Sequence, residues 1–109
     1  MNSQDGPPDA RSALLAAARD ELFENGVTAV GLRAVARRAG LSHAAPGYFF
    51  RDRAGMLTAL AAQGFDALAD ALDRAGDSAG LADLGGVYVD FGLRSGPLFD
   101  LMFQRIRIR

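Results

Sequence analysis

The stretch GLRAVARRAGLSHAAPGYFFRDR, residues 31–53, decides the fold of this chain. Its first part carries apolar residues at spacings of three and four, the period of one helix face. These residues are Leu32, Val35, Ala36 and Ala39. Gly40 follows at the point where a helix end favours a residue that tolerates positive φ. The pattern therefore predicts a short helix that ends at Ala39.

A second helix is predicted directly after this turn. The Ser42 hydroxyl can accept a hydrogen bond from a backbone N–H of the new helix, and Pro46 lies near enough to its start for the missing donor to cost little. We expect this helix to run from about His43 to Phe50. Two helices joined by a glycine-containing turn are typical of a helix-turn-helix, whose second helix enters the major groove of DNA. The same spacing also fits an ordinary helix pair in a helical core.

The charge distribution favours the DNA-binding interpretation. Residues 28–53 carry five arginines and one acidic residue, whereas residues 54–100 carry two arginines and seven aspartates. The positive charge of the first segment and the negative charge of the second nearly cancel, so the whole chain has a net charge of −1 and a pI of about 5.7. A basic patch attracts phosphates, and an acidic remainder discourages indiscriminate binding to nucleic acid. The basic patch consists of Arg33, Arg37, Arg38, Arg51 and Arg53.

Further helices are predicted on both sides of this pair. Asp9 can cap a helix that ends near Glu24, where Asn25 and Gly26 follow. Asp52 can cap a long helix that ends near Ala75. Two more helices are expected, one over about residues 80–93 and one starting at Pro97. Residues 104–109 alternate polar and apolar side chains, which is typical of a strand.

Several motifs in sequence order carry a resemblance to a known family. They are a helix end at residues 23–26, LRAVARRAGLS at 32–42, and the aromatic pair Phe49 and Phe50 followed by Arg53, Met56 and Leu57. With these motifs, residues 13–68 resemble the N-terminal DNA-binding domain of TetR-type transcriptional regulators. SHAAP at 42–46 and the stretch at 85–103 are similar to the subgroup with a C-terminal WHG domain. The resemblance covers most of the chain.

The resemblance implies an all-α protein in three parts. Residues 1–8 are expected to be a disordered arm, and residues 9–69 a three-helix helix-turn-helix domain followed by a long connecting helix. Residues 70–109 are expected to be an incomplete effector and dimerisation region, truncated at its C-terminal end. Two positions depart from the family pattern. Gly47 replaces a tyrosine that contacts the DNA backbone, and Gly31 replaces a capping serine or threonine.

The resemblance also assigns residues to sites. The expected DNA-binding residues are Arg33, Ser42, His43, Ala44, Ala45, Gly47, Tyr48 and Arg53. Arg33 and Arg53 are expected to clamp phosphates, and Arg37 and Arg38 are weaker candidates for this role. Tyr48 is expected to point outward and Phe50 inward, and His43 is expected to bond a base or a phosphate. The expected effector pocket comprises Tyr88, Phe91, Met102 and Phe103.

The leading functional prediction is a sequence-specific DNA-binding regulator, a ligand-responsive repressor by family analogy. One recognition helix makes too few base contacts for tight binding, so we expect a homodimer on a palindromic operator in double-stranded DNA where the C-terminal helices are present, together with a small-molecule effector. The alternative is a truncated interaction protein that pairs with a full-length relative and does not bind DNA alone. An enzyme is disfavoured, because the chain has one histidine, no cysteine and no glycine-rich phosphate loop.

Composition sets the remaining expectations. The chain has 109 residues, half of them hydrophobic, and can bury one small core. The absence of cysteine excludes disulfides and cysteine-ligated metal and fits a reducing cytosol. No apolar run approaches the roughly 20 residues needed to cross a bilayer. The sequence therefore predicts a soluble, cytoplasmic protein without cofactor, metal site or membrane partner.

Overall fold

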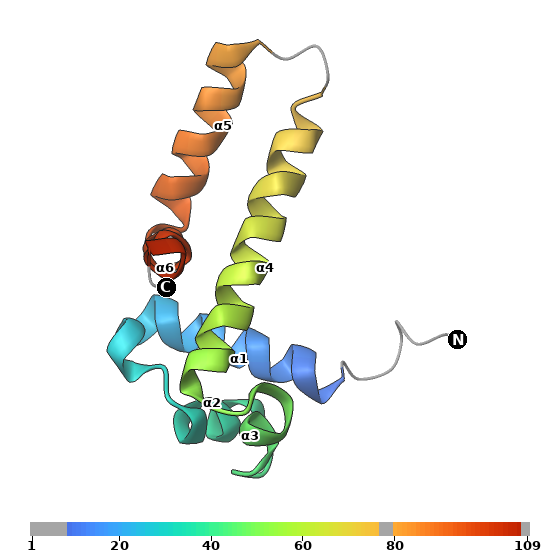
Figure 1. The fold of residues 1–109 in the computed structure, drawn as a ribbon, viewed down its shortest axis with the longest axis vertical. Helices are drawn as coiled ribbons and strands as arrows, with labels where there is room; N and C mark the ends of the chain where they lie inside the picture. The colour runs from blue at the N-terminus through green and yellow to red at the C-terminus, as the bar shows by residue number, and fades with distance from the viewer. Residues whose placement is uncertain (1–8, 77–79, 108–109) are drawn as a thin grey trace, which may run out of the picture. The chain divides into compact units, whose positions relative to one another are not determined.

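The computed structural model describes residues 9–76 and 80–107 as a series of helices (Figure 1). In chain order these are α1 (Ala10–Asn25), the short 3-10 helix η2 (Val27–Ala29), α2 (Leu32–Ala39), α3 (Ala45–Phe50), α4 (Arg53–Arg74), α5 (Leu81–Arg94) and α6 (Gly96–Arg107). No strand occurs in the described part of the chain. The predicted all-α fold class is confirmed, and the expected arm at residues 1–8 lies outside the described residues.

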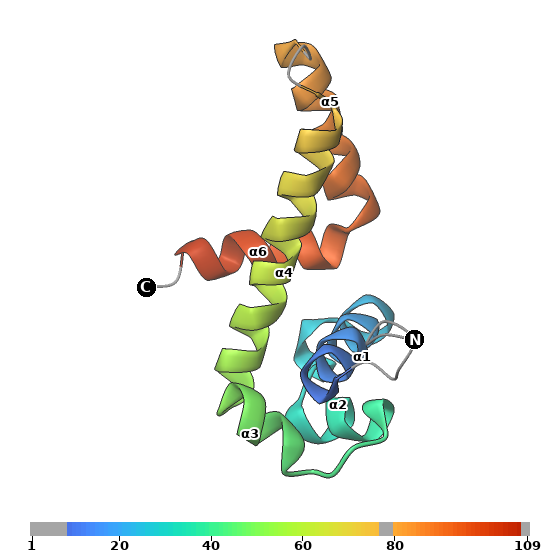
Figure 2. The ribbon, with the colours of Figure 1, turned by 90° about the vertical axis from the view of Figure 1, so that its right-hand side faces the viewer.

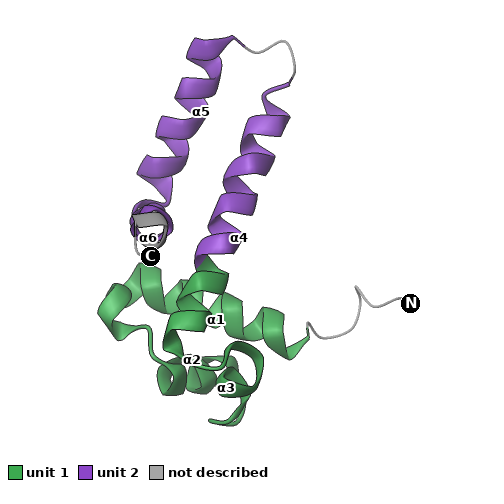
Figure 3. Cartoon of the chain, in the orientation of Figure 1, with its two compact units in different colours: residues 1–60 green, residues 61–109 purple. Residues whose placement is uncertain are grey.

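The chain divides into two compact units, coloured separately in Figure 3. The N-terminal unit comprises residues 1–60 and the C-terminal unit residues 61–109, so α4 begins in one unit and ends in the other.

The N-terminal unit is built on α1, which packs against η2, α2 and α3. Asp9 caps α1 as predicted, because its carboxylate accepts a hydrogen bond of 2.7 Å from the Ser12 N–H. Gly26 ends the helix with a φ of +88°. The core collects the apolar stripes of these helices with the first turns of α4. Its most buried members are Leu14, Ala18, Leu22, Val30, Val35, Ala36, Met56 and Leu60.

The first helix of the predicted pair has the expected bounds, but the second begins later than expected. α2 ends at Ala39, and Gly40 adopts the left-handed conformation with a φ of +73°. α3 begins at Ala45 rather than His43, and its start has no side-chain cap, so the prediction of a Ser42 hydroxyl cap is wrong. The Ser42 carbonyl instead accepts a turn hydrogen bond of 3.1 Å from the Ala45 N–H.

Pro46 explains the later start of α3. In a helix beginning at His43, Pro46 would be the fourth residue, whose N–H should make the first intrahelical hydrogen bond, and proline has no such donor. In the observed helix Pro46 lies in the first turn, where no donor is needed. The expected start of this helix at His43 is therefore wrong because of Pro46, which restricts where a helix can begin.

The second half of α4, α5 and α6 form the C-terminal unit, in which α5 runs beside α4 and α6 crosses it (Figures 1 and 2). Asp52 caps α4 as predicted, accepting a hydrogen bond of 2.8 Å from the Gly55 N–H. Gly64 allows α6 to approach α4 closely, because a Cβ built there would lie 2.7 Å from the Met102 Sδ. Leu98 and Met102, which face Gly64, are buried, and Leu68 of α4 and Leu101 of α6 are buried as well.

The prediction of a strand over residues 104–109 is wrong for residues 104–107, which continue α6. A strand must bond a neighbouring strand, and the described part of the chain offers none, whereas a helix satisfies its backbone groups locally. Residues 108 and 109 lie outside the described residues.

Candidate nucleic-acid interface

The turn before α3 and α3 itself present a polar and aromatic surface to solvent. Tyr48 has 82% of its surface exposed, and His43 and Ala44 are also exposed. Pro46 and Phe50 point the other way and are buried, Phe50 with only 6% exposed. The expected outward direction of Tyr48 and inward direction of Phe50 is confirmed. The turn and α3 therefore present His43, Ala44 and Tyr48 to solvent and Pro46 and Phe50 to the core.

Phe49 supports the exposed Tyr48 ring from the side. The two ring centroids lie 4.9 Å apart with their planes nearly perpendicular, an edge-to-face arrangement that aromatic pairs favour. Phe49 itself is 36% exposed. Tyr48 is thus an amphipathic side chain whose ring is restrained by a neighbour while its hydroxyl remains available to a phosphate or base.

The remaining expected DNA-binding positions lie around this face. Ala45 and Gly47 are half-buried in α3, and Ser42 is exposed in the turn. Arg33 and Arg37 are exposed on α2 and form no ion pair with the part of the chain that the structure describes. The structure thus brings the arginines of α2 and the exposed side chains of α3 onto one helix-turn-helix, whose contacts with DNA stay predictions.

Arg38 forms ion pairs with two acidic residues of the same chain. Its guanidinium bonds Glu21 at 2.8 Å and Glu24 at 2.7 Å, both on α1. These hydrogen bonds hold the pKa of both carboxyls below their ordinary value, and they raise the pKa of Arg38. One of the five positive charges in the basic patch is therefore neutralised locally, and the sequence balance overstates the charge available to phosphates.

Arg53 has a geometry that the sequence did not indicate. Its Nε donates to the Val30 carbonyl oxygen at 2.7 Å, and its Nη2 donates to the Val27 carbonyl oxygen at 2.7 Å. The expected phosphate contact of Arg53 stays a prediction. Two of its nitrogens are nevertheless already bonded within the protein.

Two cations near α3 were missed as individual candidates. Arg51 ends α3, is exposed and has a φ of +76° and a ψ of −55°, a conformation rare for any residue but glycine. Arg11 of α1 lies with its guanidinium 5.2 Å from the Phe50 ring centroid. The position of Arg51 directly after the aromatic pair could have drawn attention to it. No local pattern places Arg11 beside α3, because that contact joins residues far apart in the chain.

The four residues of the expected effector pocket lie in α5 and α6, and their role in binding an effector stays a prediction. Tyr88 and Phe103 belong to an aromatic cluster around Phe99, whose centroid lies 5.5 Å from Tyr88 and 4.8 Å from Phe103. Phe91 also contacts this cluster, whereas Met102 is fully buried against Gly64. Sequence reasoning missed Phe99, the centre of the cluster, although its spacing of four from Phe103 places both on one helix face.

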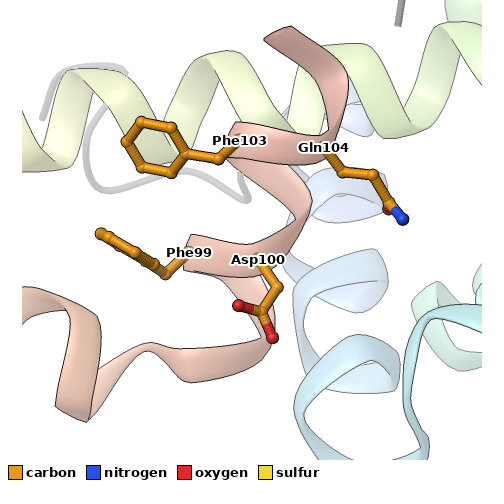
Figure 4. A pocket seen from close by; sticks show the side chains of 4 residues that line it. All are labelled: Phe99, Asp100, Phe103 and Gln104. Carbon is orange, nitrogen blue, oxygen red and sulfur yellow. The ribbon is translucent and has the colours of Figure 1, made fainter. Parts of the chain in front are cut away.

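Hollows occur among the described residues of the C-terminal unit. One of about 360 Å³ is lined by residues of α6 alone, and Figure 4 shows its two aromatic rings projecting to the same side of the helix. They belong to Phe99 and Phe103, with Asp100 and Gln104 as the polar lining. A second hollow of about 220 Å³ lies between α4 and α5 and includes Phe91.

The described residues contain no cluster of side chains suited to a metal ion, and no described helix is long and apolar enough to cross a membrane.

Comparisons with known proteins agree with this geometry. Residues 14–60 match the family model described as "Bacterial regulatory proteins, tetR family". A solved structure described as "Structure of a protein with unknown function from Rhodococcus sp. RHA1" is 39% identical to this chain, with a TM-score of 0.83. The match covers 99% of this chain and 59% of the Rhodococcus chain, so this chain spans about three fifths of that protein. No curated protein matches the chain.

Proposed function

We propose that the chain is a sequence-specific DNA-binding transcriptional regulator, on the premise that residues 14–60 match the model of the tetR family of bacterial regulatory proteins and fold as a helix-turn-helix. The observation that carries the proposal is the outward direction of Tyr48 and His43 on an otherwise well-packed helix-turn-helix. A family of regulators gives no reason to assign an enzymatic reaction to the chain.

The manner of DNA binding follows from the size of α3. α3 has six residues, and a single helix of this kind contacts only a few base edges. We propose that two copies bind a palindromic operator, each reading one half-site. α5 supports a role in association, because Leu81 and Leu93 are 87% and 81% exposed and apolar side chains of this size favour a partner.

We further propose that the regulator is a repressor that responds to a small molecule. The support for a ligand is the aromatic cluster of Phe99, Phe103 and Tyr88 beside a hollow of about 360 Å³, a volume at the lower end of small-molecule sites. The support for repression is family analogy alone. A ligand that binds this unit would alter the affinity for DNA only if its own affinity differs between the conformation that binds DNA and the one that does not.

The second candidate is an interaction protein that pairs with a longer relative and does not bind DNA alone. The exposed apolar side chains of α5 favour it as much as they favour a homodimer. The two candidates differ in whether the chain alone selects a DNA sequence.

Selection of bound duplexes from a random pool at near-physiological salt tests the proposal. The regulator should enrich a palindrome, and sedimentation should show two copies of the chain on each duplex. If the pool stays random while the chain copurifies with a longer relative, the interaction protein is correct. A single enriched half-site bound by one copy would retain DNA reading and reject the dimer.

A further inference from the structure

Arg53 joins the two ends of the helix-turn-helix. It is the first residue of α4, three residues after the end of α3, and its acceptors are the carbonyls of Val27 and Val30, which precede α2. Both hydrogen bonds measure 2.7 Å, and they span 26 and 23 residues of sequence. The whole of α2, the turn and α3 therefore lies between the donor and the acceptors.

The acceptors lie in backbone that other contacts within the N-terminal unit also hold. The Val30 side chain is fully buried, and the Val27 carbonyl also accepts the Val30 N–H at 3.1 Å within η2. The hydrogen bond to the Val30 carbonyl is partly buried, and a carbonyl left without a partner at such a site costs free energy. Hydrogen bonds from a charged donor are also stronger than neutral ones. The Arg53 guanidinium is thus anchored to backbone that follows α1 directly.

The geometry also depends on the shape of the guanidinium. Nε and Nη2 lie on one edge of a planar group and donate to two different carbonyls at once. A lysine ammonium is a compact point charge that can serve a phosphate well but does not reproduce a planar fork. Arginine and lysine at this position should therefore behave alike in a phosphate clamp and differently in a brace between two carbonyls.

We propose that Arg53 is a positioning residue for DNA recognition: it acts through the Val27 and Val30 carbonyls to fix where α3 points, and its main role is not to bind a phosphate. The proposal rests on the proposed function and deepens it by assigning specificity to a residue that faces the protein backbone. A looser brace lets the exposed Tyr48 and His43 sample several directions, so base reading suffers more than general attraction to DNA.

The test compares Arg53→Lys and Arg53→Met with Arg33→Met, an exposed arginine on α2 without this brace. Affinity is measured by fluorescence anisotropy on the selected duplex and on a scrambled duplex between about 50 and 200 mM salt, a range over which phosphate contacts weaken. Both Arg53 variants should lose about tenfold or more on the selected duplex and little on the scrambled one, with an unchanged salt slope. Arg33→Met should weaken both duplexes alike and reduce the slope by about 0.9.

A phosphate clamp gives the opposite pattern. Arg53→Lys would then bind nearly as well as the unaltered chain, and Arg53→Met would weaken both duplexes equally with a shallower salt slope. Either result overturns the positioning role.

Amide hydrogen exchange separates this test from the proposed function, because it needs no DNA. In the unaltered chain the Tyr48 amide donates to the carbonyl of Ala44, directly before α3, and the Arg51 amide donates to the Gly47 carbonyl within α3. Both should exchange faster in Arg53→Lys, while amides of α1 stay protected. Failure of the unaltered chain to select any duplex rejects the proposed function, and unchanged exchange in α3 rejects the brace.

Discussion

The guanidinium of Arg38 donates two hydrogen bonds to the carboxylate of Glu24, from Nη2 to Oε1 at 2.7 Å and from Nη1 to Oε2 at 3.2 Å. Nε of the same guanidinium reaches Glu21 at 2.8 Å. All three nitrogens of an α2 side chain are therefore used by two acids one turn apart on α1. The pairing fixes α2 against α1 at the surface, while Val35 and Ala36 fix it in the core.

This pairing makes part of the stability depend on pH. The pKa values of Glu21 and Glu24 lie below their ordinary 4.5, so each carboxylate contributes stability above that pH and loses the contribution as pH falls through its lowered pKa. Arg38→Met should lower the midpoint of thermal unfolding at pH 7, and the difference from the unaltered chain should shrink in acid below pH 4.5. Because Glu24 is largely exposed and Arg38 partly exposed, solvent screens the pairing and the loss should be small.

Arg94→Met is the matched control, since Arg94 pairs with Asp90 at 3.0 Å on a single helix and both side chains are largely exposed. It should leave the midpoint nearly unchanged. A difference for Arg38→Met that persists undiminished at low pH would contradict the role of the two carboxylates.

Tyr48→Ala and His43→Ala should change base preference without loss of fold. Both side chains are exposed, so the free energy of unfolding should change by no more than about 0.5 kcal/mol. Each contact to a base edge contributes about 1–3 kcal/mol of discrimination, so competition between duplexes with single base changes should show a flattened preference at one position. The exposed Thr58 on α4 provides a control, and Thr58→Ala should leave the preference intact. An unaltered preference in both variants would remove α3 from base reading.

Gly64→Ala should destabilise the C-terminal unit. The new methyl would meet the Met102 Sδ at 2.7 Å, its Cγ at 2.9 Å and the Leu98 Cδ1 at 3.2 Å, in a crossing where both side chains are buried. Overpacking of this kind costs about 1–3 kcal/mol, measurable by urea unfolding.

Gly86→Ala is the control for helix propensity, because a Cβ at Gly86 of α5 meets no atom within 4 Å. It should stabilise the chain by about 0.5–1 kcal/mol. Equal gains from both glycine substitutions would show that α6 does not press on Gly64.

Arg51→Gly should separate stability from binding. Arg51 has a φ of +76° and a ψ of −55°, a strained conformation for a residue with a side chain, and glycine removes that cost of about 1 kcal/mol or more. Chemical denaturation should therefore show a more stable variant. If the exposed guanidinium contacts DNA, affinity should fall on all sequences at the same time. A variant that is both more stable and fully active would exclude Arg51 from the interface.

Local sequence features were sufficient for most element boundaries. Asp9 and Asp52 cap helices where short polar side chains precede apolar periodicity, and Gly40 ends α2 because it alone nearby tolerates a positive φ. The opposite directions of Tyr48 and Phe50 also follow from helical geometry, since residues two apart lie on different faces. These features depend on neighbours within about four residues, which the sequence displays directly.

The sequence by itself therefore determined the helical fold, the helix-turn-helix and the exposed face of α3. Only the tertiary structure decided how the arginines are used: Arg38 bonds acids on α1, Arg53 bonds carbonyls before α2, and Arg11 covers Phe50. The sequence does not distinguish these arginines from one another, because the groups that Arg38 and Arg53 bond lie 14 to 26 residues away along the chain. Helix periodicity is a local property of the chain, whereas the partner of a long, flexible cation is set by which distant backbone and carboxylate groups the folded core brings within reach.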